Sequence, residues 1–275
     1  MTKLTLCTVL LLPISLAGIL SFLLGCISPG ARDLAIYRVN ITKLATELVH
    51  LSVSTKHNVS DLVHPDLPSH WYFGLSGICD FFADGPDRAR GPTVSGTTHC
   101  RRAFPPNVNV LSVVHDSLRA NVVPDWDESE KTITAVMDAW KEMYGNTPAS
   151  LLRDGASAVN AQNRAAAALA ILSMILDLAN VGVSVKLGPL AVCVVGLVST
   201  VMVIISGVLT ILAMNGGMHG VVRETGHVSG SLVFLFIAAL MKLPAVFVFI
   251  AIVCGLLYCC LPNLFTVTRV AILGG

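Results

Sequence analysis

Two cysteines are the residues of the polar middle of this sequence whose chemistry is easiest to state. Cys79 ends "HWYFGLSGIC" and Cys100 ends "GTTHC", whereas the other six cysteines lie within or beside apolar segments. An isolated pair is expected to be oxidised in a secretory compartment. Closing a loop of about 20 residues then contributes roughly 3 kcal/mol in the chain-entropy model. We therefore predict a Cys79–Cys100 disulfide, with two free thiols as the alternative.

Two charged residues interrupt the apolar segments. Asp177 lies inside one apolar stretch and Lys242 inside another. Charges within membrane helices usually face the bundle interior and pair with each other. At 1.5 Å per residue the two fall at similar depth below the outer helix ends, so we predict an ion pair. In the alternative, Lys242 snorkels to the surface or marks a helix break at "MKLP".

No sequence motif indicates catalysis. The chain has no Walker loop, HExxH or GxSxG, and its eight histidines lack the tight spacing of metal ligands. The net charge of +1 gives no nucleic-acid footprint. We expect a protein that is not an enzyme, with no metal, cofactor, nucleic-acid partner or small-molecule substrate.

The elements that carry these residues are mostly apolar helices. Only 13% of the 275 residues are charged and the mean hydropathy is +0.73, against about 25% charged residues in soluble domains. The composition predicts a mainly α membrane protein, a bundle of four spanning helices. The expected spans are residues 4–27, 165–185, 190–214 and 231–261. The last is long enough for one tilted helix or for a helix kinked near Pro244.

The first apolar block has three interpretations. Residues 4–27 run without a charge, which favours an uncleaved spanning helix over the shorter core of a cleaved signal peptide. A lipoprotein signal ending at Cys26 is the third option.

An even number of spans places both termini on one side. We expect cytoplasmic residues 1–3 and 262–275, with residues 28–164 and the loop 215–230 outside. The sequons "NIT" at Asn40 and "NVS" at Asn58 are candidate glycosylation sites. Cys259 and Cys260, near the cytoplasmic end of the last span, are palmitoylation candidates or simply buried thiols.

The polar region 28–164 mixes helix and strand patterns. "HWYFGLSGI" is typical of a strand with a bend. Apolar residues recur at helical spacing in 38–53 and 127–144, which predicts two helices. The apolar face of the second helix packs into a core or lies on the membrane surface. Residues 84–96 are typical of an exposed hairpin tip.

The stretch "WYFGLSGIC" with the later "THC" resembles the claudin-superfamily signature. Gly74, Leu75, Gly77, Cys79 and Cys100 fit that pattern. Ser76 stands where an apolar residue is usual. The run "THCRRAFPPN" is similar to the fungal Sur-seven/PalI family of cortical-patch proteins.

That resemblance implies an extracellular β-containing loop domain above a four-helix bundle. In it the disulfide joins two strands. Trp71, which is also part of the signature, either anchors this domain at the membrane interface or packs in a core.

The resemblance also implies a function. It is a plasma-membrane organiser of eisosome-type cortical domains that supports cell-wall organisation. Its expected partners are membrane lipids, other membrane or cortical proteins, or further copies of the chain. The alternative is a signalling component, like the mating calcium regulators or the PalI ambient-pH sensors. The carboxylates Asp80, Asp84 and Asp87 are offset by nearby arginines, which disfavours a cation funnel.

Overall fold

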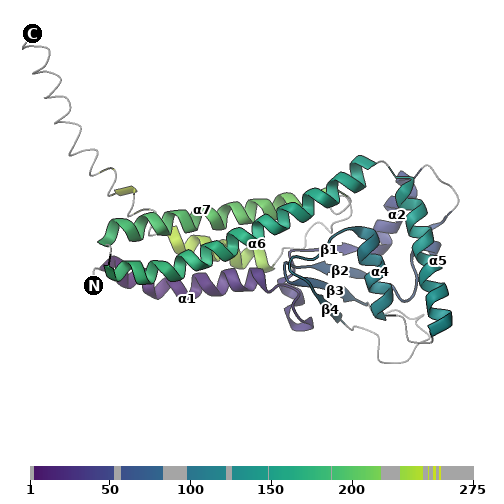
Figure 1. The fold of residues 1–275 in the computed structure, drawn as a ribbon, viewed down its shortest axis with the longest axis horizontal. Helices are drawn as coiled ribbons and strands as arrows, with labels where there is room; N and C mark the ends of the chain where they lie inside the picture. Colours follow the sequence, from purple (N-terminus) through teal and green to yellow (C-terminus); the bar gives the residue numbers. More distant parts are fainter. Residues whose placement is uncertain are drawn as a thin grey trace, which may run out of the picture.

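The chain folds into a long helical bundle with a small sheet at one end (Figure 1). This computed structural model describes residues 3–52, 57–82, 98–121, 126–147, 149–186, 188–217 and 230–243, with 247, 250, 251 and 254. The described chain is mostly helical and contains a single antiparallel sheet.

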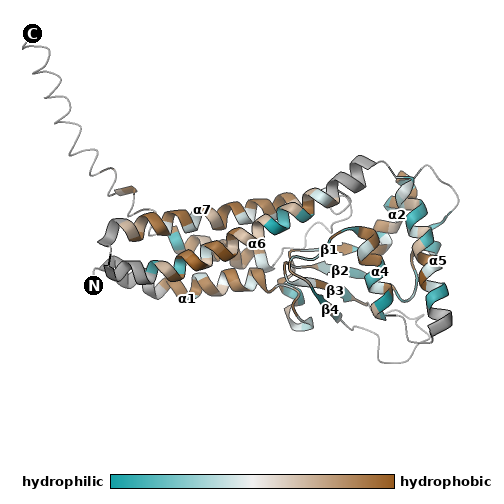
Figure 2. Cartoon of the chain, viewed as in Figure 1, coloured by the Kyte–Doolittle hydropathy of each residue, from teal (hydrophilic) through white to brown (hydrophobic). Residues whose placement is uncertain are grey.

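The bundle consists of α1 (Lys3–Leu23), α6 (Ala149–Lys186), α7 (Gly188–Met214) and the helix Gly230–Leu243. α6 lies along both α7 and α1. The helix Gly230–Leu243 approaches α1 closely, because a Cβ on Gly18 would lie 2.5 Å from the carbonyl oxygen of Phe234. Apolar residues cover α1, α7 and the part of α6 beside them (Figure 2).

One stretch in the described chain, Ala191–Met214 of α7, is long and apolar enough to cross a membrane. Leu11–Leu23 and Gly230–Leu243 are apolar but shorter. Most of the expected last span beyond residue 243, with Pro244, lies outside the described residues. Length and composition therefore support one candidate span, and the four-span arrangement stays a prediction.

α6 extends well beyond the span expected at residues 165–185. It begins at Ala149 and runs without interruption to Lys186. The added segment is rich in alanine, the best helix former. Ala156, Val159 and Asn163 are buried at helical spacing along it. One helix therefore links the bundle to the polar region (Figure 1).

The sheet contains four antiparallel strands in sequence order: β1 (Tyr37–Asn40), β2 (His70–Phe73), β3 (Gly77–Phe81) and β4 (Thr98–Arg102). The expectation of one bent strand in "HWYFGLSGI" is wrong. This segment forms two strands joined by a tight turn, in which the Gly74 amide donates to the Gly77 carbonyl at 3.0 Å.

Among the described residues, five helical segments pack against the sheet or against one another. They are η1 (Pro29–Leu34), α2 (Ile41–Leu51), α3 (Val59–Leu62), α4 (Val110–Asn121) and α5 (Trp126–Gly145). We call the sheet with these segments the stapled domain. Both helices predicted from apolar spacing are present as α2 and α5, but the first begins later than predicted, because residues 38–40 belong to β1.

The apolar faces of α2 and α5 are buried in one core. α2 buries Ile41, Leu44 and Leu48, and α5 buries Met137, Trp140 and Met143. The indole of Trp140 donates to the Leu62 carbonyl at 2.9 Å. The core-packing interpretation of α5 is therefore the correct one. The expected hairpin tip 84–96 and most of the loop 215–230 lie outside the described residues.

Candidate functional site: the stapled hairpin and the buried ion pair

The predicted disulfide joins two neighbouring strands. Cys79 of β3 and Cys100 of β4 are directly opposite partners, with an S–S distance of 2.04 Å and a Cα–Cα distance of 4.0 Å. Cys79 is fully buried beside Cys26, Ala35 and Tyr72. The disulfide therefore ties the outer strand β4 to the rest of the sheet.

The turn between β2 and β3 rests on the end of α1. The Ser76 amide donates to the Gly25 carbonyl at 3.3 Å, and the Ser76 hydroxyl donates to the Leu23 carbonyl. The last carbonyls of a helix have no partner within the helix. The turn thus caps α1 and fixes the stapled domain to the bundle.

The two signature glycines lie where backbone meets backbone. A Cβ on Gly74 would overlap the Gly25 carbonyl oxygen, and one on Gly77 would overlap the Arg101 carbonyl oxygen and lie 2.8 Å from that of Cys26. Only glycine permits these approaches. Leu75, between them, is fully buried.

The role of Ser76 is not evident from the sequence. This serine stands where the claudin-type signature has an apolar residue, yet it is 7% exposed and supplies both hydrogen bonds to the end of α1. Its partners are more than 50 positions earlier in the chain, so no local pattern points to them.

A charged network lies on the face of β3 and β4 opposite to the disulfide. Asp80 is fully buried, 3.1 Å from the Arg101 guanidinium. Its carboxylate accepts hydrogen bonds from the Ser117 hydroxyl at 3.0 Å and from the side-chain amide of Asn121 at 3.2 Å. Burial raises the pKa of the Asp80 carboxyl, and the Arg101 guanidinium opposes that rise. The network ties the sheet to α4.

Asp80 and Arg101 each follow a stapled cysteine by one residue. Because side chains alternate along a strand, both point away from the disulfide. The sequence predicts that nearby arginines offset the charges of Asp80, Asp84 and Asp87. For Asp80 this is confirmed, because it is buried with the Arg101 guanidinium 3.1 Å away. Asp84 and Asp87 lie outside the described residues.

Trp71 does not anchor the domain at a membrane surface. Its side chain is fully buried, and its indole N–H donates to the Ser117 hydroxyl at 2.9 Å. Ser117 also contacts Asp80, so Trp71 belongs to the same network. Of the two interpretations of Trp71, core packing is correct.

The two charges predicted to pair lie together in the bundle. The Lys242 ammonium is 2.8 Å from the Asp177 carboxylate, and both residues are buried. The ammonium also donates to the hydroxyls of Ser173 at 2.8 Å and Ser199 at 2.7 Å. Asp177 accepts further hydrogen bonds from Ser199 at 2.6 Å and Ser15 at 3.3 Å.

This polar cluster takes one or more residues from each of the four bundle helices. Ser15 lies on α1, Ser173 and Asp177 on α6, Ser199 on α7 and Lys242 on the helix Gly230–Leu243. Buried charges are tolerated when they are paired and hydrogen-bonded. The cluster therefore defines the register of the four helices. Sliding α6 or the helix Gly230–Leu243 would separate the charges, and sliding α1 or α7 would break the hydrogen bonds of Ser15 or Ser199.

The two sequons differ in accessibility. Asn40 is half-buried at the start of α2, where its side-chain oxygen accepts from the Lys43 amide at 2.9 Å. Its side-chain nitrogen is 3.3 Å from His70 Nε2. Asn58 is exposed. Cys259 and Cys260 lie outside the described residues.

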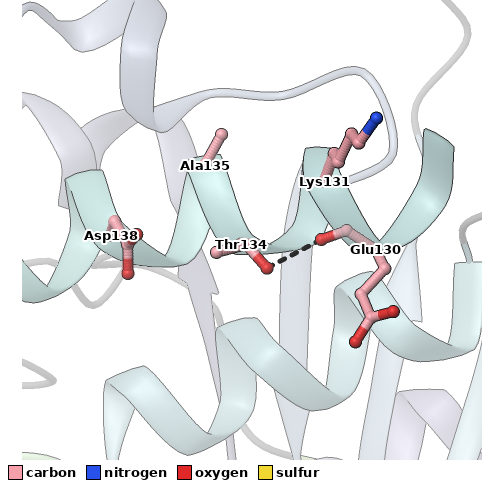
Figure 3. Close-up of a pocket in the computed structure, with 5 residues that line it drawn as sticks. All are labelled: Glu130, Lys131, Thr134, Ala135 and Asp138. Atoms are coloured by element: carbon pink, nitrogen blue, oxygen red, sulfur yellow. Dashed lines mark hydrogen bonds between the residues drawn. The ribbon is translucent and has the colours of Figure 1, made fainter. Parts of the chain in front are cut away.

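A surface concavity runs along α5. Glu130, Lys131, Thr134, Ala135 and Asp138 line it, all from one helix face (Figure 3). The Thr134 hydroxyl donates to the Glu130 carbonyl at 2.7 Å. The charged side chains of Glu130, Lys131 and Asp138 point in different directions and not toward one another (Figure 3). Within the described residues, no group of three or more histidine, cysteine or acidic side chains is placed to hold a metal ion.

Comparison with known proteins gives no relative: no family model, curated protein or solved structure matches the chain.

Proposed function

We propose that this chain is a non-enzymatic plasma-membrane protein that organises lateral domains of a fungal cell cortex. In this proposal four helices span the bilayer and the stapled domain lies outside the cell. The proposal combines the resemblance to the Sur-seven/PalI family with the geometry of the bundle and the staple.

The exposed surface of the bundle is the main support for a membrane location. Large apolar side chains are exposed on every bundle helix. Examples are Leu20 of α1, Ile175 of α6, Ile204 of α7 and Phe236, which is 71% exposed, of the helix Gly230–Leu243. Monomeric soluble proteins rarely expose a contiguous apolar surface larger than a few hundred Å². Lipid chains are the natural cover for such a surface.

The staple supports an external position for the sheet. Disulfides persist in oxidising compartments, and Cys79 and Cys100 are bonded. α1 begins at the end of the bundle remote from the sheet (Figure 1). With the sheet outside, the N-terminus is cytoplasmic, and a fourth span returns the C-terminus to the same side.

An organiser needs a rigid surface and lateral contacts rather than chemistry. The capped end of α1 holds the stapled domain on the bundle, and the Asp80 network holds the sheet against α4 within that domain. The domain is thereby fixed on the bundle and presents one defined surface. We propose other membrane or cortical proteins, or further copies of this chain, as its lateral partners, with lipids around the bundle.

Imaging tests this function. The full chain carrying a fluorescent protein at its C-terminus is expected to form static cortical patches in living fungal cells. Cys79→Ser should disperse them, because the outer strand then loses its covalent tie. Cys254→Ser is the matched control, since Cys254 is an exposed free cysteine. Signal confined to mating or fusion tips would favour a calcium-regulator role instead, and retention of the wild-type chain in internal membranes would contradict both.

A further inference from the structure

One exposed aromatic side chain distinguishes the membrane-facing end of the stapled domain. Phe104 is 54% exposed, and it is the only exposed large apolar side chain among those described between residues 28 and 164. The other exposed ones lie on the bundle, at residues 14–24 and beyond 171. The domain otherwise buries its large apolar groups, so Phe104 is an exception.

Phe104 lies in the chain just after the contact between the sheet and the end of α1, which we call the joint. Arg102 is the strand partner of Gly77, and the Ala103 amide donates to the Ser76 carbonyl at 3.0 Å. The Arg102 Nε donates to the Ile27 carbonyl at 3.3 Å, just past the end of α1. Two residues span at most about 7 Å, so Phe104 lies close to the level at which α1 ends.

That level is also where the exposed large apolar side chains of α1 end. Leu24, one residue after α1, is 41% exposed. Arg102 and Phe104 are both exposed and lie two positions apart in the chain. Apolar side chains such as phenylalanine enter the boundary between headgroups and acyl chains in interfacial segments that also carry cations, and a guanidinium matches the geometry of a phosphate group. The pair fits a phospholipid, with the ring among the upper acyl carbons and the guanidinium at the headgroup.

We propose that Phe104 and Arg102 form a lipid anchor that seats the stapled domain on the outer leaflet of the bilayer. The phenyl ring enters the boundary between headgroups and acyl chains, and Arg102 binds a lipid phosphate. The anchor rests on the proposed membrane location of the bundle. It adds a contact between the external domain and lipid to the one made by the helices.

Fluorine NMR of the full chain in phosphatidylcholine nanodiscs tests the anchor. A fluorinated phenylalanine is placed singly at Phe104, Phe236 or Phe81, and a phosphatidylcholine spin-labelled near the start of its acyl chain is added. Phe236 reports on the bundle. Phe81 is half-buried at the opposite end of the sheet from the joint, where it pairs with Thr98. We expect the spin label to remove the Phe104 and Phe236 signals and to leave the Phe81 signal.

The outcomes separate the anchor from the proposed function. Loss at Phe236 with the Phe104 signal retained overturns the anchor and leaves the membrane bundle standing. Signals retained at both positions overturn the membrane location, and the anchor with it. Loss at all three positions also overturns the anchor, because the label would not report depth.

A second variant tests the phosphate contact. Arg102→Gln in the chain labelled at Phe104 should restore part of the lost signal, because the ring is then held less firmly at the interface. Arg119→Gln, an exposed arginine on α4, is the matched control and should restore none. An unchanged loss in Arg102→Gln overturns the role of Arg102 in the anchor.

Discussion

Neighbouring residues of β3 and β4 make their contacts on opposite faces of the sheet. Cys79 and Cys100 join the strands on one face, whereas Asp80 and Arg101 face α4 on the other. Ser76, in the turn, bonds to the end of α1. A short segment of sequence therefore contacts three different parts of the molecule.

The pH dependence of stability should reveal the buried carboxyl of Asp80. Its pKa is raised in the folded chain, above an unfolded value of about 3.9. Between the two values the folded state binds more protons, so the free energy of unfolding falls as pH rises through this window. Asp80→Asn should lose that slope in unfolding of the detergent-solubilised chain. Asp116→Asn, an exposed residue on α4, should retain it; equal slopes in the two variants would contradict the assignment.

Glycosylation should distinguish the two sequons. A glycan on the Asn40 nitrogen would displace His70 and crowd the start of α2, whereas Asn58 is exposed. We expect Asn58→Gln to abolish the mobility shift produced by endoglycosidase. Asn40→Gln should leave this shift unchanged. A shift that survives Asn58→Gln and disappears in Asn40→Gln would reverse the assignment.

Helices of the bundle are held together by small residues and one polar cluster. The Ser206 hydroxyl of α7 donates to the Ala166 carbonyl of α6 at 2.8 Å. Gly18 allows α1 to approach the helix Gly230–Leu243. Lipid tails are as apolar as the helix surfaces, so the hydrophobic effect contributes little to helix association in a membrane. Close packing and hydrogen bonds decide it instead.

The ion pair should behave as a coupled unit. Asp177→Asn and Lys242→Met each leave one buried charge without its partner, which costs about 3–5 kcal/mol. The double variant removes both charges, so its loss should be smaller than the sum of the single losses. Detergent-induced unfolding in mixed micelles measures the three values. Additive losses would show that the pairing contributes nothing to stability. Asp33→Asn is the control, because Asp33 is an exposed acid.

In the whole molecule, the contact between the β2–β3 turn and the end of α1 fixes the stapled domain to the bundle. Gly25, Gly74 and Gly77 meet there as backbone on backbone. α6 forms a second link, because it runs from the bundle into the polar region. With these two links the stapled domain has one orientation relative to the helices.

Filling the joint should loosen the whole stapled domain. Gly74→Ala places a methyl group against the Gly25 carbonyl and 3.0 Å from the Cys26 side chain. We expect it to lower the free energy of unfolding by roughly 3 kcal/mol or more and to speed hydrogen exchange in β2 and β3. Gly30→Ala is the control in the same region, since a Cβ there meets nothing within 4 Å. Similar exchange in both variants would argue against the joint.

Features that depend on local pattern or on position along a helix could be predicted from the sequence. Apolar spacing predicted α2 and α5, because a helix repeats its buried face every three to four residues. Isolation in the polar region predicted the Cys79–Cys100 bond. The depth of Asp177 and Lys242 along their helices predicted their contact, now seen at 2.8 Å.

Contacts between residues far apart in the chain became known only from the folded structure. The hydroxyl of Ser76 meets Leu23, Trp71 meets Ser117, and Asp80 becomes buried under α4. No periodicity encodes these contacts, because a period describes a residue's neighbours on its own element and not the element packed against it. The turn in "HWYFGLSGI" likewise depends on α1, whose end its glycines approach.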